Sequence, residues 1–149
     1  MEAENTPTEI LPAHECWQLL RNAPFGRLAL CIQGVPGIFP VNFVVEHGTI
    51  VFRTSEGTKS RFSEKASVAL EADGFLDDGA RVWSVIVHGQ AATISRTSEL
   101  MDTVTLPLHP WEMGRKDRFM RLVPETITGR SFAPQRVSAH SRTARAHDE

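Results

Sequence analysis

The chain has 149 residues, of which 41% are hydrophobic and 23% charged, and this composition suits a single domain that fills one core. The formal net charge of −2 argues against general electrostatic attraction to nucleic acid. Two cysteines are too few for a cysteine-rich metal site, and no apolar run approaches the roughly 18–20 residues that a membrane span needs. The N-terminus lacks the pattern of a signal peptide, so we expect a cytoplasmic protein.

The first predicted element is a helix from about Ala13 to Asn22. Its apolar residues follow the i, i+3, i+4, i+7 spacing of one buried stripe. Pro24 ends it, because the residue before a proline is pushed out of helical geometry.

Three strands are predicted next from the alternation of apolar and polar residues. They cover Arg27 to Gln33, Ile38 to Glu46 and Thr49 to Thr54. Glycine and proline predict a turn at Gln33–Gly37, and His47–Gly48 is typical of a two-residue hairpin loop. The three strands therefore form an antiparallel meander.

The second half of the chain is predicted to mix strands with short helices and loops. The longest β pattern, Val82 to Ser95, is apolar on both faces near its start, as in a strand buried on both sides. The remaining predicted elements are a brief helix (Thr58 to Lys65), a strand (Ser67 to Asp73), an acidic loop (Gly74 to Gly79), a helix (Thr97 to Val104), a loop (105–116) and two last strands (Asp117 to Val123 and Glu125 to Phe132).

Six or so strands with short hairpins and a few small helices predict a mainly β fold, an antiparallel barrel that is closed or nearly closed. We expect residues 1–9 to be flexible, residues 10–132 to form the domain and residues 133–149 to be a disordered tail. The arginines of that tail are interpreted as a solvated end and not as a nucleic-acid site.

Most familiar catalytic motifs are absent, but the run Phe52 to Lys59 places several anion-binding groups together. A strand ends in Arg53 and Thr54, Gly57 permits a tight turn, and Thr58 and Lys59 open a short helix. Guanidinium, ammonium, hydroxyl and free backbone N–H groups all favour phosphate. The alternative is a polar strand-to-helix turn with solvated charges.

Several short runs occur in the order in which a known family has them. They are Gly26-Arg27-Leu28-Ala29, Pro40-Val41-Asn42-Phe43, Phe52-Arg53-Thr54 with Gly57-Thr58-Lys59, Val68-Ala69-Leu70-Glu71-Ala72-Asp73, Trp83-Ser84-Val85 with Gly89, and Pro124-Glu125 with Thr128-Gly129-Arg130. On these runs, and over roughly residues 10–132, the chain resembles the pyridoxamine 5′-phosphate oxidase-related, FMN-binding split-barrel proteins of the small actinobacterial type.

The resemblance implies a six-stranded antiparallel split β-barrel that forms a homodimer, with two FMN sites at the dimer interface. It implies a phosphate site of Arg53, Thr58 and Lys59, an isoalloxazine site of Val41, Asn42, Phe43 and Thr54, a segment with Trp83 and Ser84 that reaches the flavin from the partner subunit, and Arg130 at the cofactor's border.

Two tryptophans leave alternatives open. Trp83 and Trp111 could stack on a flavin or close a substrate pocket, or each could be a barrel plug or an interface anchor. We include both among the candidate cofactor-binding residues.

The function that this resemblance implies is an FMN-dependent oxidoreductase that transfers hydride between the flavin and a small planar acceptor. A deazaflavin-dependent reductase and a flavin-binding module without turnover are the alternatives. The C-terminal segment that grips pyridoxamine phosphate in the oxidase proper has no recognisable counterpart, so vitamin B6 oxidation is not expected. No metal, membrane or nucleic-acid partner is expected.

Overall fold

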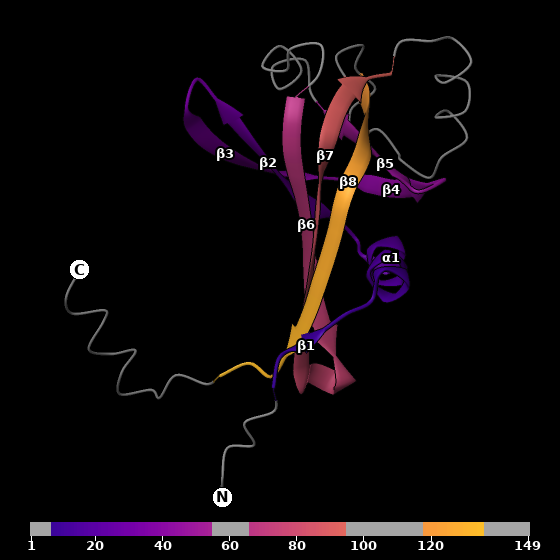
Figure 1. Ribbon diagram of the computed structural model, residues 1–149, viewed down its shortest axis with the longest axis vertical. Helices are drawn as coiled ribbons and strands as arrows, with labels where there is room; N and C mark the ends of the chain where they lie inside the picture. The colour runs from indigo at the N-terminus through magenta and orange to yellow at the C-terminus, as the bar shows by residue number, and fades with distance from the viewer. Residues whose placement is uncertain (1–6, 55–65, 95–117, 136–149) are drawn as a thin grey trace, which may run out of the picture.

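The computed structural model describes residues 7–54, 66–94 and 118–135 (Figure 1). None of the helices in these segments is long and apolar enough to cross a membrane. The elements in chain order are β1 (Glu9–Ile10), α1 (Ala13–Asn22), β2 (Gly26–Ile32), β3 (Val35–Val41), β4 (Phe43–Glu46), β5 (Thr49–Thr54), β6 (Ala66–Leu76), a 3-10 turn (Asp77–Gly79), β7 (Arg81–Thr93) and β8 (Arg118–Phe132).

The strands form one antiparallel sheet in the order β3-β2-β6-β7-β8-β5-β4, and β1 pairs with β8. In Figure 1 the long strands β6, β7 and β8 run along the molecule, and the β2–β3 and β4–β5 hairpins lie on either side of them. Strands β3 and β4 are at opposite ends of this order, yet Asn42 is the only residue between them in the chain. A single residue spans only about 7 Å between its neighbours, so the sheet must curl until its two ends meet.

The core lies inside this curl, where alternate residues of β2, β6 and β7 are buried. Helix α1 packs against β4, β7 and β8 and adds Cys16 and Leu20 to the core. Gly129 on β8 allows the helix to come close, because a Cβ there would lie 2.5 Å from the Cys16 Sγ. Burial, followed by the neighbouring Glu15, raises the pKa of the Cys16 thiol, so this cysteine is a packing residue. The fully buried strand residues of this core include Leu28, Ile50, Phe52, Leu70, Val85, Val87, Met120 and Leu122.

Strand β8 is one continuous strand where the sequence predicts two, and a β-bulge explains the difference. Gly89 of β7 pairs with Pro124 while His88 pairs with Thr126, so Glu125 is an extra residue on β8. Before the extra residue one alternate set of β8 positions is buried, and after it the other set is buried. The alternation of apolar and polar residues from which a strand is predicted is therefore interrupted there. Pro124 has no N–H to donate, and prolines inside sheets are confined to such places.

Four other predictions need correction. The predicted strand Ile38 to Glu46 is broken at Asn42 into β3 and β4, and the predicted turn at Gln33–Gly37 is shorter because β3 already begins at Val35. The acidic loop starts later than Gly74, because β6 continues to Leu76. With β1 added, the described residues form eight strands, where the alternation pattern predicts seven and the family resemblance implies six.

Other predictions are confirmed. Helix Ala13–Asn22 and strand Thr49–Thr54 have the predicted bounds. The His47–Gly48 loop has the positive φ angles, 50° and 72°, of a tight hairpin turn. The predicted helices Thr58 to Lys65 and Thr97 to Val104 and the loop 105–116 lie outside the described residues.

Candidate functional site

Five of the predicted cofactor residues meet where the two ends of the sheet join. Val41 pairs with Gly26 at the end of β3, Phe43 pairs with Phe52 at the start of β4, and the Arg53 N–H donates to the Asn42 carbonyl oxygen at 3.4 Å. We call this place the β3–β5 corner; it contains Val41, Asn42, Phe43, Arg53 and Thr54. The β4–β5 hairpin brings Phe43 next to β5, and the Asn42 junction adds the end of β3 to the same place.

The side chains of the corner divide into two groups. Those of Val41 and Phe43 are buried in the core, so only their main-chain groups are available to a ligand. Asn42 and Arg53 are half-buried. On β5, Arg53 alternates with Phe52 and lies on the outer face of the sheet, which we define as the face opposite the core.

Thr54 carries the most telling feature of the corner. Its side chain is 5% exposed, and within the described part of the chain its Oγ1 is buried without a hydrogen-bond partner. A buried polar atom left without a partner costs about 1–3 kcal/mol. A flavin fits this feature, because its ring, ribityl and phosphate oxygens can all accept a hydrogen bond from a hydroxyl, and Arg53 next to Thr54 supplies a cation for the phosphate.

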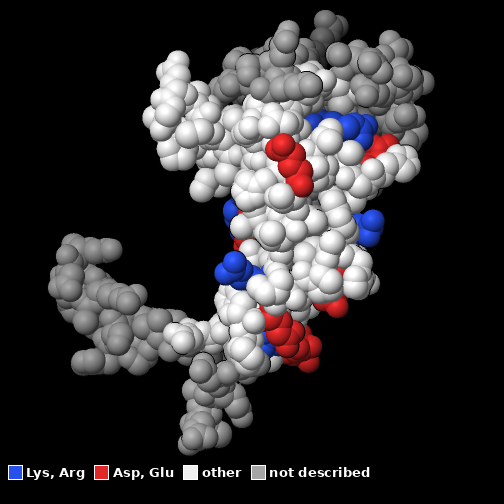
Figure 2. All heavy atoms as spheres, in the orientation of Figure 1, with Lys and Arg blue, Asp and Glu red and all other residues white. Residues whose placement is uncertain are grey.

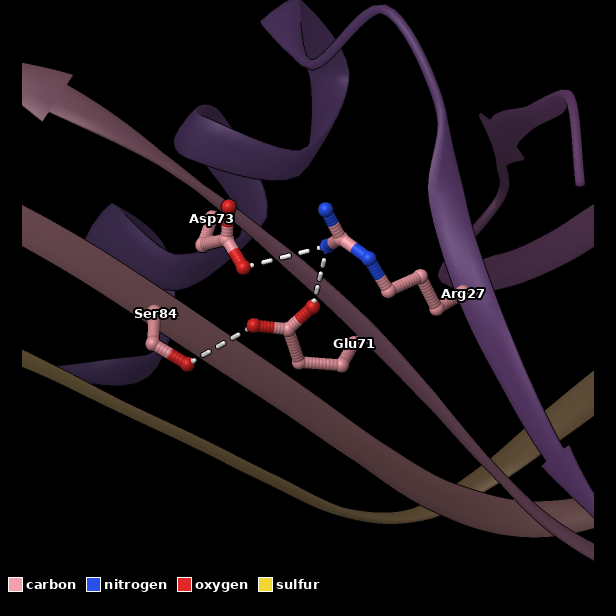
Figure 3. Close-up of polar contacts among 4 residues, drawn as sticks. All are labelled: Arg27, Glu71, Asp73 and Ser84. Atoms are coloured by element: carbon pink, nitrogen blue, oxygen red, sulfur yellow. Dashed lines mark hydrogen bonds and ion pairs between the residues drawn. The ribbon is translucent and has the colours of Figure 1, made fainter. Parts of the chain in front are cut away.

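A second polar group lies on the outer face of β2, β6 and β7 (Figure 3). The Arg27 Nη1 is 2.8 Å from the Glu71 Oε1 and 3.1 Å from the Asp73 Oδ2, and the Ser84 Oγ donates to the Glu71 Oε2 at 3.3 Å. We call these four residues the Arg27 cluster. The carboxylates and Arg27 also line a cavity of about 300 Å³ with Ala29 and Ile38.

The ionisation of Glu71 reflects this crowding. Desolvation by burial raises the pKa of the Glu71 carboxyl, and the hydrogen bond and charge of Asp73 raise it further. Arg27 acts in the opposite direction and lowers it. One guanidinium is shared between two carboxylates, so it does not fully offset their repulsion.

The remaining candidates lie in different surroundings. Ser84 belongs to the Arg27 cluster, and Arg130 is its exposed neighbour across β8. Trp83 is 6% exposed and packs in the core against Gly74, where a Cβ would come within 2.8 Å of its Nε1. This placement favours the barrel plug among the alternatives for Trp83. Thr58, Lys59 and Trp111 lie outside the described residues.

Sequence analysis missed two polar groups because the register of pairing creates them. Arg27, Glu71 and Ser84 come from three strands, and only the pairing of β2 with β6 and of β6 with β7 brings them together. The second group is Arg121, whose Nη1 donates to the Thr49 Oγ1 at 2.7 Å and whose Nη2 is 3.2 Å from the Glu46 Oε2. The signal in the sequence for either group was a charged residue at a strand position that faces away from the core. The face seen in Figure 2 accordingly shows acidic and basic side chains interspersed.

Comparison with known proteins identifies the family. The family model described as pyridoxamine 5′-phosphate oxidase matches residues 12–131. An FAD-binding protein from Mycobacterium smegmatis is 39% identical, with 85% of this chain and 100% of that chain covered and a TM-score of 0.76. A conserved protein of unknown function from Corynebacterium diphtheriae is 32% identical, with 85% and 99% covered and a TM-score of 0.73. The uncharacterized protein Rv0080 of Mycobacterium tuberculosis is 34% identical over 89% of this chain and 88% of its own length. The fold and these matches together show that the chain belongs to the pyridoxamine 5′-phosphate oxidase family.

Proposed function

We propose that this chain is a flavin-dependent oxidoreductase that binds a flavin mononucleotide unit, as FMN or as the FMN half of FAD, at the β3–β5 corner. The observation that carries the proposal is the buried Thr54 hydroxyl, which finds no partner among the described residues and follows Arg53 directly in the chain. The family match and the FAD-binding relative from Mycobacterium smegmatis support a flavin as the ligand.

Each residue of the corner has a task that follows from its chemistry. Arg53 offers a permanently charged, forked donor to the phosphate, and the Thr54 hydroxyl donates to an oxygen of the cofactor. Asn42 presents its amide at the junction of the strands, where its backbone carbonyl already holds the Arg53 N–H. Thr58 and Lys59 are predicted to complete the phosphate site.

The chain itself provides binding, orientation and shielding from water. The bound flavin supplies the hydride transfer to a small planar acceptor, so the chain needs no acid–base catalyst of its own. The buried walls formed by Val41 and Phe43 keep the inner side of the corner dry. Exclusion of water strengthens the contacts that Arg53 and Thr54 make with the cofactor.

We propose in addition that the active form is a homodimer in which Ser84 and Arg130 of one subunit approach the flavin of the other. The outer face of the β2–β3 hairpin supports a second copy as partner, because Ile38 is 69% exposed and its cross-strand neighbour Ala29 is also exposed. An isologous contact between two such patches would bury them. Replacing Ile38 by Asp should shift the protein toward monomer in light scattering, whereas Val35→Asp at the tip of the hairpin should not. A monomeric wild type would contradict this part.

The proposed function is tested on the purified full-length chain by its absorbance spectrum and by titration with FMN, FAD and a deazaflavin. We expect saturable binding of a flavin at micromolar concentration and reduction of the bound flavin by NADH, NADPH or another donor. Preference for the deazaflavin would favour the reductase alternative. Binding without reduction or reoxidation by any acceptor would favour a module without turnover, and no binding of any of the three would overturn the proposal.

A further inference from the structure

A cavity of about 390 Å³ lies on the outer face of β7 and β8, away from the Arg27 cluster. Its apolar walls are Ala92, Ile94 and Val123, and its polar side chains include Gln90 and Thr93. This volume lies within the range of small-molecule sites, which combine apolar walls with a few placed polar groups. Of the candidate cofactor residues that the structure describes, none lines this cavity.

The cavity adjoins Arg53 on the same face of the sheet. Arg53 pairs with Phe119, and the next outward residue of β8, Arg121, lines the cavity. Diagonal neighbours of this kind are about 7–8 Å apart. Ile94 lines the cavity and also packs with Val51, the next outward residue of β5. A ligand whose phosphate is held by Arg53 therefore has the cavity within reach of its next groups.

The charges around the cavity favour a neutral group over a second anion. The Arg121 guanidinium is already engaged, with Nη1 on the Thr49 Oγ1 and Nη2 near the Glu46 carboxylate. The carboxylate of Glu125 also lines the cavity. Among the described residues, the Arg121 guanidinium therefore faces the carboxylates of Glu46 and Glu125, and these three groups together offer a phosphate no net positive charge.

The polar edge of the cavity suits a heteroaromatic ring with an amino group. The Gln90 Nε2 donates to the Ser67 Oγ at 2.8 Å, which orients the Gln90 carbonyl oxygen as an acceptor. Thr93 adds a hydroxyl that both donates and accepts. Adenine has flat apolar faces, ring nitrogens that accept and an exocyclic amino group that donates, so it matches this combination.

We propose that this cavity holds the adenine ring of FAD, and that the chain consequently binds FAD more tightly than FMN. The inference rests on the proposed flavin site at the β3–β5 corner, because the position of Arg53 sets where the second half of a dinucleotide must go. The diphosphate then lies between Arg53 and the cavity, and the adenine ring packs against the apolar walls of the cavity, of which Val123 is the most exposed.

The test is calorimetric titration of the full-length wild type and of three variants with FAD and with FMN. Val123→Phe narrows the cavity at a side chain that is 53% exposed, and Gln90→Leu removes the acceptor with little change in size. Val35→Phe makes the same replacement as the first variant at another exposed valine, on the far edge of the sheet.

We expect the wild type to bind FAD at least about tenfold more tightly than FMN, because the second half of the ligand adds buried contacts. Val123→Phe and Gln90→Leu should each remove most of that preference while FMN affinity stays within about twofold, and Val35→Phe should change neither. Retained FMN binding also shows that a variant is folded. Equal affinities of the wild type for FAD and FMN, or equal losses for both ligands in Val123→Phe, would overturn this inference and leave the flavin site standing. Failure of the wild type to bind either flavin would overturn both.

Discussion

The β3–β5 corner and the Arg27 cluster both gather polar side chains on one curled sheet, but they differ in how their polar atoms are paired. In the cluster, Arg27 contacts two carboxylates, and Ser84 donates to the nearer one. In the corner, the Thr54 hydroxyl is buried and has no partner among the described residues. The contacts within the cluster account for its polar atoms, whereas the Thr54 hydroxyl is a donor that a bound ligand could pair with. The comparison therefore supports the corner as the place where the proposed flavin binds.

The strongest test of this comparison replaces one arginine in each region by alanine. Arg53→Ala should lower flavin affinity about ten- to a hundredfold, because a lost charge-assisted hydrogen bond costs about 1.5–3 kcal/mol. Arg27→Ala, on the neighbouring β2, should leave flavin affinity within about twofold. Titration of both variants measures the difference. Equal effects of the two replacements would remove the distinction between the regions.

A sharper test removes one hydroxyl from each region. Thr54→Val should stabilise the flavin-free protein by about 1 kcal/mol, since it deletes a buried donor without a partner, and should weaken flavin binding several-fold. Ser84→Ala should give no such stabilisation, because the Ser84 hydroxyl already donates to Glu71. Thermal unfolding with and without flavin measures both effects. A Thr54→Val protein that is less stable than the wild type without flavin would argue against a ligand at this atom.

The smallest expected effect concerns the pH dependence of the Arg27 cluster. The pKa of Glu71 in the folded protein is raised above its ordinary value of 4.5, so the folded state binds more protons than the unfolded state just above that pH. The stability contributed by this carboxyl is therefore present below pH 4.5 and is lost as the pH rises through the folded pKa.

Replacing Glu71 by Gln removes this dependence. Relative to Glu71→Gln, the wild type should lose free energy of unfolding as the pH rises above 4.5, and Asp73→Asn should reduce that loss because Asp73 raises the Glu71 pKa. Denaturant titrations over a series of pH values measure it. If the free energies of unfolding of the wild type and of Glu71→Gln changed with pH in parallel, the pKa of Glu71 would not be raised in the folded protein.

The pattern of apolar and polar residues predicted the bounds of those helices and strands whose burial follows one pattern along their whole length. Helix α1 buries one stripe and ends before a proline, and β5 ends three residues before Gly57 in the sequence, so their bounds follow from neighbouring residues. Prediction failed where the environment changes within a strand. At Asn42 the chain passes from one end of the sheet to the other, and at Glu125 a bulge exchanges the buried and exposed positions of β8.

The candidate site also contains some features that follow from neighbouring residues and others that depend on residues far apart in the chain. Arg53 and Thr54 are adjacent in the chain, so the sequence alone shows that they stand together, and anion binding by them stays a prediction. The Arg27 cluster and the cavity beside Arg121 could not, because each depends on the register between strands that are distant in the chain. Backbone hydrogen bonds between strands are the same for every residue type, so they do not select a register. The register is decided by which face of each strand is buried.

The sequence by itself determined that the chain is mainly β, where its one described α-helix lies, and that a strand ends in a pair of residues suited to a phosphate. Only the tertiary structure decided that Asn42 joins the two ends of the sheet, that Trp83 faces the core, and that a cavity opens beside Arg53. The physical reason is that alternation and propensity act between neighbours in the chain, whereas the curl of the sheet depends on all of its strands packing around one core.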